Sequence, residues 1–264
     1  MATIKEVALK TIDLEARAVS GLSAFINDDF EKAVQAIFSG KGRVVVSGIG
    51  KSAIIAHKIV ATFNSTGTPS IFMHAADAIH GDLGMVQQND VLMLISKSGE
   101  SPEIKVLVPL LKNFGNTLIA MVGNTDSYLA RNASIVLNTS VEQEACPNNL
   151  APTSSTTAQL VMGDALAICL MELNGFQSQD FAKFHPGGSL GKKLYLRVSD
   201  LYADNEKPQV LAGQSLKEVI VEMTAKRLGI TAVVDPDGSL LGIITDGDLR
   251  RMLEKNSDIE KVKA

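Results

Sequence analysis

The sequence predicts an α/β fold, a three-layer αβα sandwich built on a five-stranded parallel sheet. Short runs rich in Val and Ile recur along the chain, and segments long enough for helical crossovers separate the first four. Parallel strands need such crossovers and are buried on both faces, so they read as near-continuous apolar runs. The predicted strands are residues 43–47, 69–73, 90–95, 117–122 and 133–137.

The predicted helices fit between and around these strands. The N-terminal stretch "MATIKEVALKTIDLEARAV" is amphipathic with charges throughout, unlike a signal peptide. "SAIIAHKIVATFN" has helical spacing, and Pro102 with Ser101 before it opens another helix. "LVMGDALAICLMEL" (residues 160–173) comes nearest to a membrane span, but its length, Asp164 and Glu172 favour a core helix.

The amino-acid composition limits the classes of protein and partner that fit this chain. The chain has 264 residues, 45% of them hydrophobic and 20% charged, which predicts one or two globular domains. A net charge of −4 gives no electrostatic argument for binding nucleic acid or an anionic membrane. Cys146 and Cys169 form no metal-type pair, which suits the reducing cytoplasm.

Polar loops follow most of the predicted strands. "SGIGKS" follows the first, "HAADAIHGD" the second, "SKSGES" the third and "NTSVEQEACPNN" the fifth. Ligands of open parallel sheets bind outside the carboxyl ends of the strands. We therefore expect a ligand site at this edge.

The loop after the third strand is suited to an anion, in particular a phosphate. Ser96, Ser98 and Ser101 supply hydroxyls where a helix begins, and a helix start offers free N–H groups and positive dipole charge. The alternative is a well-capped helix with a polar loop.

"SGIGKSA" is not a P-loop, but Gly48, Gly50 and Ala53 match the dinucleotide pattern G-x-G-x-x-A. A nicotinamide-dependent oxidoreductase is therefore one alternative, although only Asp77 could serve as the ribose-binding acid. Lys51 could clamp a phosphate or substrate, or be a solvated lysine at a helix start.

Histidines and carboxylates complete the set of candidates. His74, His80 and His185 lie in predicted loops, where proton transfer is favoured over metal binding. Glu103 falls in the first turn of a helix, and Glu142 and Glu144 lie beyond the fifth strand. Together with Lys51 and the serine loop, these residues suit acid–base chemistry on a phosphorylated small molecule.

The motifs "GIGKS", "HGDLG", "SKSGES", "APTSSTTAQLVMGDALA" and "FHPGGSLGKKL" resemble the sugar isomerase (SIS) domain of the arabinose-5-phosphate isomerases, over roughly residues 4–196. The resemblance implies interconversion of D-arabinose 5-phosphate and D-ribulose 5-phosphate, the first step toward the Kdo of lipopolysaccharide or capsule. It also implies a homotetramer with sites between subunits and no required cofactor.

The same resemblance implies roles for individual residues. Lys51, Glu103, Glu144 and His185 would be catalytic, and His74 would hold an inhibitory divalent metal such as zinc. The residues expected to bind substrate are Gly48, Ser52, Gly67, Thr68, His74, His80, Ser96, Ser98, Ser101, Ser140 and Glu142.

The predicted second region, residues 197–264, differs from the isomerase region at residues 1–196. "LGITAVVDPDGSLLGIITDGDLRRML" reads as strand, turn, strand and helix, and resembles one cystathionine-β-synthase (CBS) motif. Family members usually carry two in tandem. We expect either a shortened form or pairing with another chain, with ligand sensing and a scaffold role both open.

The chemistry predicts a mechanism. His185 or His80 would open the sugar ring, Lys51 would stabilise an enediolate, and a glutamate would move the proton between carbons. Glu103 lies close to the expected phosphate, so Glu144 is favoured as the base. A non-catalytic sugar-phosphate sensor is the second alternative.

Overall fold

The computed structural model describes residues 2–188, 191–192, 194, 197–203, 205–255 and 261–264. The chain divides into two compact units, Met1–Leu194 and Tyr195–Ala264. The predicted domain boundary after residue 196 falls at residues that lie outside the described ones, as do residues 189–190 and 193 of the "HPGGSLGKKL" motif.

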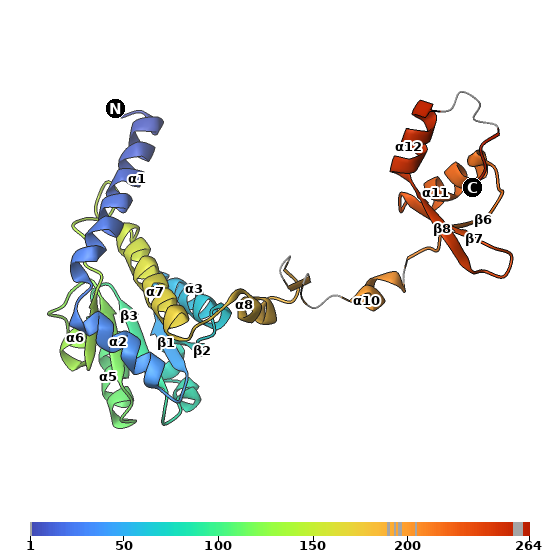
Figure 1. Ribbon diagram of the computed structural model, residues 1–264. Coiled ribbons are helices and arrows are strands. Elements are labelled where there is room, and N and C mark those ends of the chain that lie inside the picture. The colour runs from blue at the N-terminus through green and yellow to red at the C-terminus, as the bar shows by residue number, and fades with distance from the viewer. Residues whose placement is uncertain (1, 189–190, 193, 195–196, 204, 256–260) are drawn as a thin grey trace. The chain divides into compact units, whose positions relative to one another are not determined.

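The first unit is an α/β sandwich (Figure 1). Its strands are β1 (Val44–Gly48), β2 (Ser70–His74), β3 (Val91–Ser96), β4 (Leu118–Val122) and β5 (Ile135–Asn138). Its helical segments are α1 (Ile4–Gly21), η1 (Leu22–Phe25), α2 (Asp28–Ser39), α3 (Lys51–Ser65), α4 (Ala75–Ala78), η2 (Asp82–Met85), α5 (Pro102–Asn113), α6 (Tyr128–Asn132), α7 (Ser154–Leu173) and α8 (Ser178–Phe184).

All five strands of this sheet are parallel, in the order β2-β1-β3-β4-β5. The five predicted strands are therefore confirmed, with ends shifted by one or two residues. Every residue of β1, β3 and β4 is buried, as expected for central strands covered on both faces. The edge strand β5 alternates between buried and half-buried residues.

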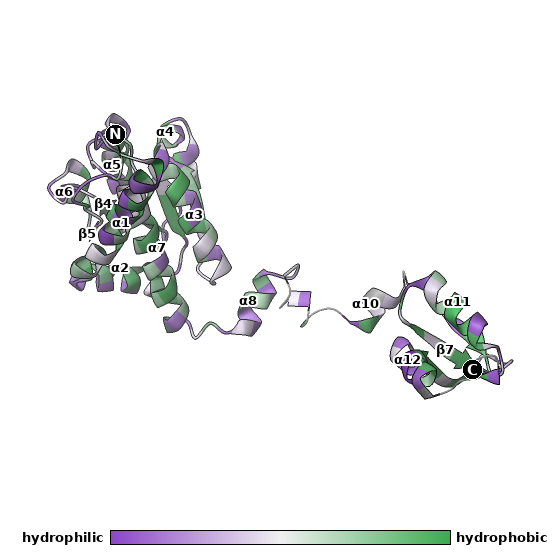
Figure 2. Ribbon diagram, turned by 90° about the horizontal axis from the view of Figure 1, so that it is seen from above, coloured by the Kyte–Doolittle hydropathy of each residue, from purple (hydrophilic) through white to green (hydrophobic). Residues whose placement is uncertain are grey.

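Two hydrophobic cores lie on the two faces of the sheet. Met93 points into a core with helices α2, α3 and α7, whereas Leu92 and Leu94 point into a core with α4, α5 and α6. This alternation follows from the two-residue period of a strand. Figure 2 shows hydrophobic segments along α3 and α7. The sandwich therefore has three layers, as predicted.

The helix α7 is the one described helix with the length and hydropathy of a membrane span. Its side chains Met162, Leu166 and Leu170 are fully buried in the core that it shares with α2 and α3. This packing is that of a core helix, as the sequence predicts for residues 160–173.

The second unit holds a three-stranded sheet. Its elements are α10 (Val198–Tyr202), β6 (Gln209–Leu211), α11 (Leu216–Lys226), β7 (Ile230–Val234), β8 (Leu240–Thr245) and α12 (Asp246–Lys255). The strand β7 pairs parallel with β6 and antiparallel with β8. Asp235 accepts a hydrogen bond from Ser239 N (2.8 Å) and closes the turn between β7 and β8. The predicted strand, turn, strand and helix are thus confirmed.

Candidate active site

The candidate site lies at the carboxyl edge of the five-stranded sheet. The strands β1 and β3 are neighbours although β2 lies between them in sequence, so their connections leave in opposite directions. This is the switch point where open α/β sheets bind ligands. The loops that follow β1 and β3 meet there.

The β1–α3 loop brings backbone and a cation to this point. Gly50 has φ +59°, a conformation that side chains rarely adopt, and it directly precedes α3. Lys51, the first residue of α3, is exposed. Ser52 Oγ donates to Gln159 Oε1 on α7 (3.3 Å), and Ser47 Oγ at the end of β1 is buried without a partner in the described part of the chain.

The serine loop after β3 has the predicted geometry. Ser101 caps α5 by accepting from Ile104 N, and Pro102 is the first helical residue. Ser96 Oγ accepts from Gly99 N (3.0 Å), and Ser98 Oγ accepts from Glu100 N (3.3 Å). Each hydroxyl that accepts a backbone hydrogen bond still has its own O–H to donate. These serines can therefore donate to an anion without losing their loop contacts.

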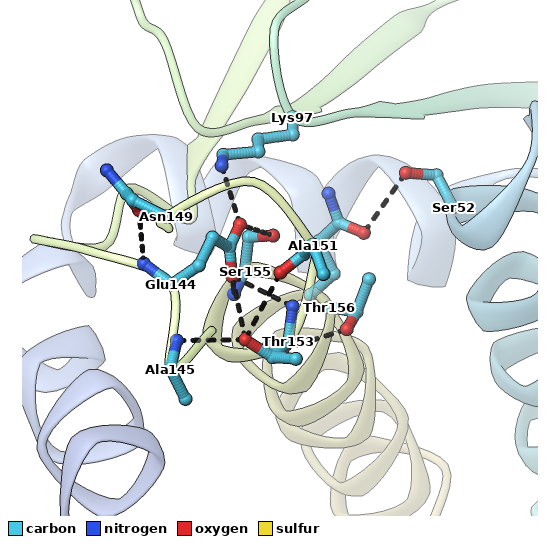
Figure 3. Close-up of polar contacts among 10 residues, drawn as sticks. Ser52, Lys97, Glu144, Ala145, Asn149, Ala151, Thr153, Ser155 and Thr156 are labelled. Atoms are coloured by element: carbon cyan, nitrogen blue, oxygen red, sulfur yellow. Dashed lines mark hydrogen bonds and ion pairs between the residues drawn. The ribbon is translucent and has the colours of Figure 1, made fainter. Parts of the chain in front are cut away.

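Glu144 lies in the loop between β5 and α7 (Figure 3). Its side chain is fully buried. Oε1 accepts from Lys97 Nζ (2.6 Å) and Ser155 Oγ (2.5 Å). Oε2 accepts from Thr153 N (2.8 Å), Thr153 Oγ1 (3.2 Å) and Ser155 N (3.1 Å). Asn149 Oδ1 accepts from the backbone N–H of Glu144 (2.7 Å), which fixes the loop.

These contacts hold Glu144 as a carboxylate. Burial alone would raise its pKa, but hydrogen bonds from Lys97, Ser155 and Thr153 outweigh burial and lower the pKa to about 2. A carboxylate with such a low pKa has little tendency to take up a proton near neutral pH. The surroundings therefore weigh against the base role that the sequence favours for Glu144.

Glu103 has different surroundings. It lies half-buried in the first turn of α5, and its carboxylate forms no hydrogen bond or ion pair with the described part of the chain. Its oxygens are therefore available to a proton on a ligand.

Next to Glu144 is a cavity of about 390 Å³, lined by Lys97, Ser98, Gly123, Asn124, Thr139, Val141 and Ser155. Thr139 follows β5, is 1% exposed, and its Oγ1 has no hydrogen-bond partner among the described residues. Ser140 and Glu142 line a second cavity of about 370 Å³, which lies against α1. The loop after β5 therefore contributes to both cavities.

The histidines after β2 also lie at the carboxyl edge. His74 ends β2, and its Nδ1 lies 3.5 Å from Asp77 Oδ2, while His80 is exposed. Among the described residues, no group of three His, Cys, Asp or Glu side chains could hold a metal ion. The pair of His74 and Asp77 provides two ligands, fewer than the three or four protein ligands typical of zinc.

Three further predicted site residues, Gly67, Thr68 and His185, lie at the amino edge of the sheet, opposite the carboxyl edge. Gly67 and Thr68 precede β2, and a Cβ at Gly67 would lie 2.9 Å from the ring of Phe176 and 3.9 Å from that of Phe184. His185 directly follows Phe184. The 20-residue helix α7, about 30 Å long, separates this region from Glu144. One chain alone does not bring His185, Gly67 or Thr68 to the residues at the carboxyl edge.

Sequence reasoning missed the partners of Glu144. Lys97, Thr153 and Ser155 received no role, although Lys97 lies between two serines that did. The hydroxyl-rich start of "APTSSTTAQ" was a signal for donors at a helix N-terminus. No sequence pattern indicated that these donors converge on a carboxylate from another loop.

Comparison with known proteins identifies the families that this chain resembles. The SIS domain model matches residues 37–169, and the CBS domain model matches residues 198–255. Arabinose 5-phosphate isomerase KdsD of Pseudomonas aeruginosa is 54% identical over 256 residues, covering 97% of this chain and 78% of that protein. KdsD of Escherichia coli K12 is 47% identical and covers 98% of this chain and 79% of that protein.

A solved structure is similar to this chain as well. A protein of E. coli CFT073 in complex with arabinose 5-phosphate is 42% identical, with a TM-score of 0.67, and covers 70% of this chain and 100% of that one. None of these three comparisons favours the oxidoreductase alternative raised by Gly48 and Gly50. With these identities over nearly its whole length, the chain belongs to the arabinose 5-phosphate isomerase family of SIS-domain proteins.

Proposed function

We propose that this protein interconverts D-arabinose 5-phosphate and D-ribulose 5-phosphate through an enediolate, as the first step of Kdo biosynthesis. The names of its relatives support this reaction, as does the sugar phosphate bound by a structural neighbour. The observation that carries the proposal is the serine loop. Ser96 and Ser98 retain O–H groups to donate to a phosphate at the switch point, where Lys51 begins α3 after the neighbouring strand β1.

The reaction moves one proton from carbon 2 to carbon 1 and a second proton between their oxygens, and it changes no overall oxidation state. A base removes the hydrogen on carbon 2 of the open-chain aldose, and the electrons of that bond form the enediolate. The proton is returned to carbon 1, and the proton of the carbon-2 hydroxyl passes to the oxygen on carbon 1, so that carbon 2 becomes the ketone and carbon 1 a primary alcohol. Lys51 stabilises the negative charge on the oxygens, and the phosphate held by the serine loop sets the position of the reacting carbons. No redox cofactor is needed.

The two glutamates take different roles in this proposal. The sequence favours Glu144 as base, but its carboxylate accepts five hydrogen bonds and has a pKa of about 2. We therefore assign the proton transfer to Glu103, whose carboxylate accepts none in the described part of the chain. Glu144 acts as a fixed negative charge beside the cavity.

The separation of the predicted residues supports an oligomeric site. His185, Gly67 and Thr68 lie at the amino edge of the sheet, so they can act on the substrate only at the carboxyl edge of another copy. We propose a homotetramer in which His185 of one copy, or His80 of the same copy, opens the sugar ring. A divalent metal at His74 would need ligands from that second copy, and we expect such a metal to inhibit. We expect the protein to act in the cytoplasm.

The test is a coupled ketose assay of the purified protein against five- and six-carbon sugar phosphates. We expect turnover of D-arabinose 5-phosphate and very little turnover of unphosphorylated arabinose. Equal rates with the sugar that lacks phosphate would contradict the phosphate role of Ser96 and Ser98. Tight binding of sugar phosphate without any turnover would instead favour the non-catalytic sensor.

A further inference from the structure

Lys97 is the cation of the Glu144 network, and it comes from a different loop. It follows Ser96 at the end of β3, and its backbone carbonyl accepts from Gly123 N (3.0 Å), which fixes the lysine backbone beside β4. From there its ammonium reaches Glu144 Oε1 at 2.6 Å. The other four donors to this carboxylate belong to Thr153 and Ser155, which lie close to one another at the start of α7.

The two partners differ in exposure. The side chain of Glu144 is fully buried, whereas that of Lys97 is 44% exposed and lines the cavity of about 390 Å³. Ser98, the next residue and a proposed phosphate donor, lines the same cavity. One ion pair thus joins the phosphate-binding loop to the loop that holds Glu144, at the wall of the cavity.

We propose that Lys97 is a positioning residue of the isomerase: its ammonium keeps Glu144 charged and in place, and ties the serine loop to the β5–α7 loop. The inference rests on the proposed function. Removing the ammonium leaves a buried carboxylate with neutral donors only. Its charged form is then less stable, so Glu144 becomes easier to protonate.

Few other charged groups face Glu144. In the described part of the chain, Lys97 is the only charged group within ion-pair distance of it. Glu142, two residues earlier, is exposed. Cys146, two residues later, has a thiol whose pKa is lowered by the backbone N–H groups of Ala151 and Leu150. Any change in the titration of Glu144 on replacing Lys97 is therefore attributable to the lysine itself.

The test compares Lys97→Met, which removes the charge, with Lys97→Arg, which keeps it. Lys97→Met should raise the pKa of the Glu144 carboxylate by about 1–3 pH units, the usual effect of losing one close opposite charge, so kcat/KM should begin to fall at a higher pH than in wild type. Lys97→Arg should restore most of the wild-type profile. The matched control is Lys58→Met, because Lys58 also joins two elements of the fold, α3 and α7, through an exposed ion pair with Asp164. The control should keep the wild-type profile.

A second measurement does not depend on the reaction. The stability contributed by the low pKa of Glu144 should be lost in wild type only as pH falls below about 4.5, its ordinary value, toward about 2. In Lys97→Met the pKa of the folded state rises, so this pH-dependent loss should shrink, and adding Glu144→Gln should remove what is left of it. A wild type that is inactive on D-arabinose 5-phosphate but shows this pH behaviour would refute the proposed function and keep the ion-pair role. An unchanged profile in Lys97→Met, or equal defects in Lys97→Met and Lys97→Arg, would overturn the proposal for Lys97.

Discussion

Two carboxylates are buried at opposite edges of the same sheet, and each is paired with a cation. Asp90 immediately precedes β3 and accepts from Arg43 through the backbone N–H (2.8 Å) and through Nη2 (2.9 Å). Glu144 follows β5 and accepts from Lys97. Burial alone would raise the pKa of each, but in both cases the hydrogen bonds outweigh burial and lower it.

The two pairs differ in what surrounds the cation. Arg43 also donates to Met85 O (2.8 Å), so its guanidinium is occupied by the amino edge of the sheet. Lys97 lines a cavity beside a loop of serines. A buried ion pair is therefore no sign of function by itself, because the same physics closes off a sheet edge at Asp90. The open cavity and the carboxyl edge make the pair at Glu144 a candidate for function.

The largest expected effect is on stability, at Asp90. Asp90→Ala leaves the Arg43 guanidinium and two backbone N–H groups without their acceptor, so the free energy of unfolding should fall by about 3–5 kcal/mol. The kcat per folded molecule should stay unchanged. Urea unfolding and the coupled assay measure both. Asp164→Ala, which breaks an exposed pair with Lys58, is the control and should cost about 1 kcal/mol or less. A loss of kcat in folded Asp90→Ala would show that the Asp90 pair also contributes to activity, and so contradict the difference in role between the two ion pairs.

The next effect is on catalysis, and it separates Glu144 from Glu103. Glu103→Gln keeps the size of the side chain but removes the base, so kcat should fall by about 100-fold or more with little change in KM. Exchange of the carbon-2 hydrogen with deuterated water should stop. Glu144→Gln should lower kcat but leave measurable exchange. The opposite pattern, with exchange persisting in Glu103→Gln and absent in Glu144→Gln, would restore the assignment favoured by the sequence.

A smaller effect on the free energy of unfolding should appear when the pH is lowered. Because the pKa of Glu144 is lowered from 4.5 to about 2, its stabilising contribution is present above about pH 4.5 and is lost as pH falls toward 2. The loss should be about 3 kcal/mol, because the pKa is lowered by about 2.5 units and each unit corresponds to about 1.4 kcal/mol. Unfolding midpoints measured across this range should fall less steeply in Glu144→Gln than in wild type. Equal slopes would mean that Glu144 has an ordinary pKa.

The fold was predictable because its signals are local. The apolar runs of β1 to β5, the cap formed by Ser101 and Pro102, and the turn at Asp235 each depend on a few neighbouring residues. The loops of the candidate site were also found, since the carboxyl ends of parallel strands meet at one edge.

The contacts within the site were not predictable in the same way. Lys97 and Glu144 are separated by 47 residues and come from different loops, so no spacing in the sequence connects them. The low pKa of Glu144 is a property of five converging donors, and without them the choice between Glu103 and Glu144 rested on distance from the phosphate alone. The placement of Gly67 and His185 at the far edge likewise depends on the course of α7.

The smallest expected effect concerns an unpaired hydroxyl of the cavity. Thr139 Oγ1 is buried without a partner in the described part of the chain, whereas Thr66 Oγ1 is buried and donates to Thr62 O (2.9 Å). Replacing a paired hydroxyl by a methyl group costs about 1 kcal/mol, whereas replacing an unpaired one costs nothing or stabilises. Thr139→Val should therefore keep or raise the free energy of unfolding, and Thr66→Val should lower it.

Thr139→Val, which should not lower stability, should weaken substrate binding. If a sugar hydroxyl pairs with Thr139 Oγ1 when the cavity fills, Thr139→Val should raise KM for D-arabinose 5-phosphate by roughly 5- to 10-fold, the worth of one hydrogen bond. Thr66→Val, at the end of α3 away from the cavity, should leave KM unchanged. A Thr139→Val protein that is less stable and has wild-type KM would show that the hydroxyl has a structural partner and that the substrate does not use it.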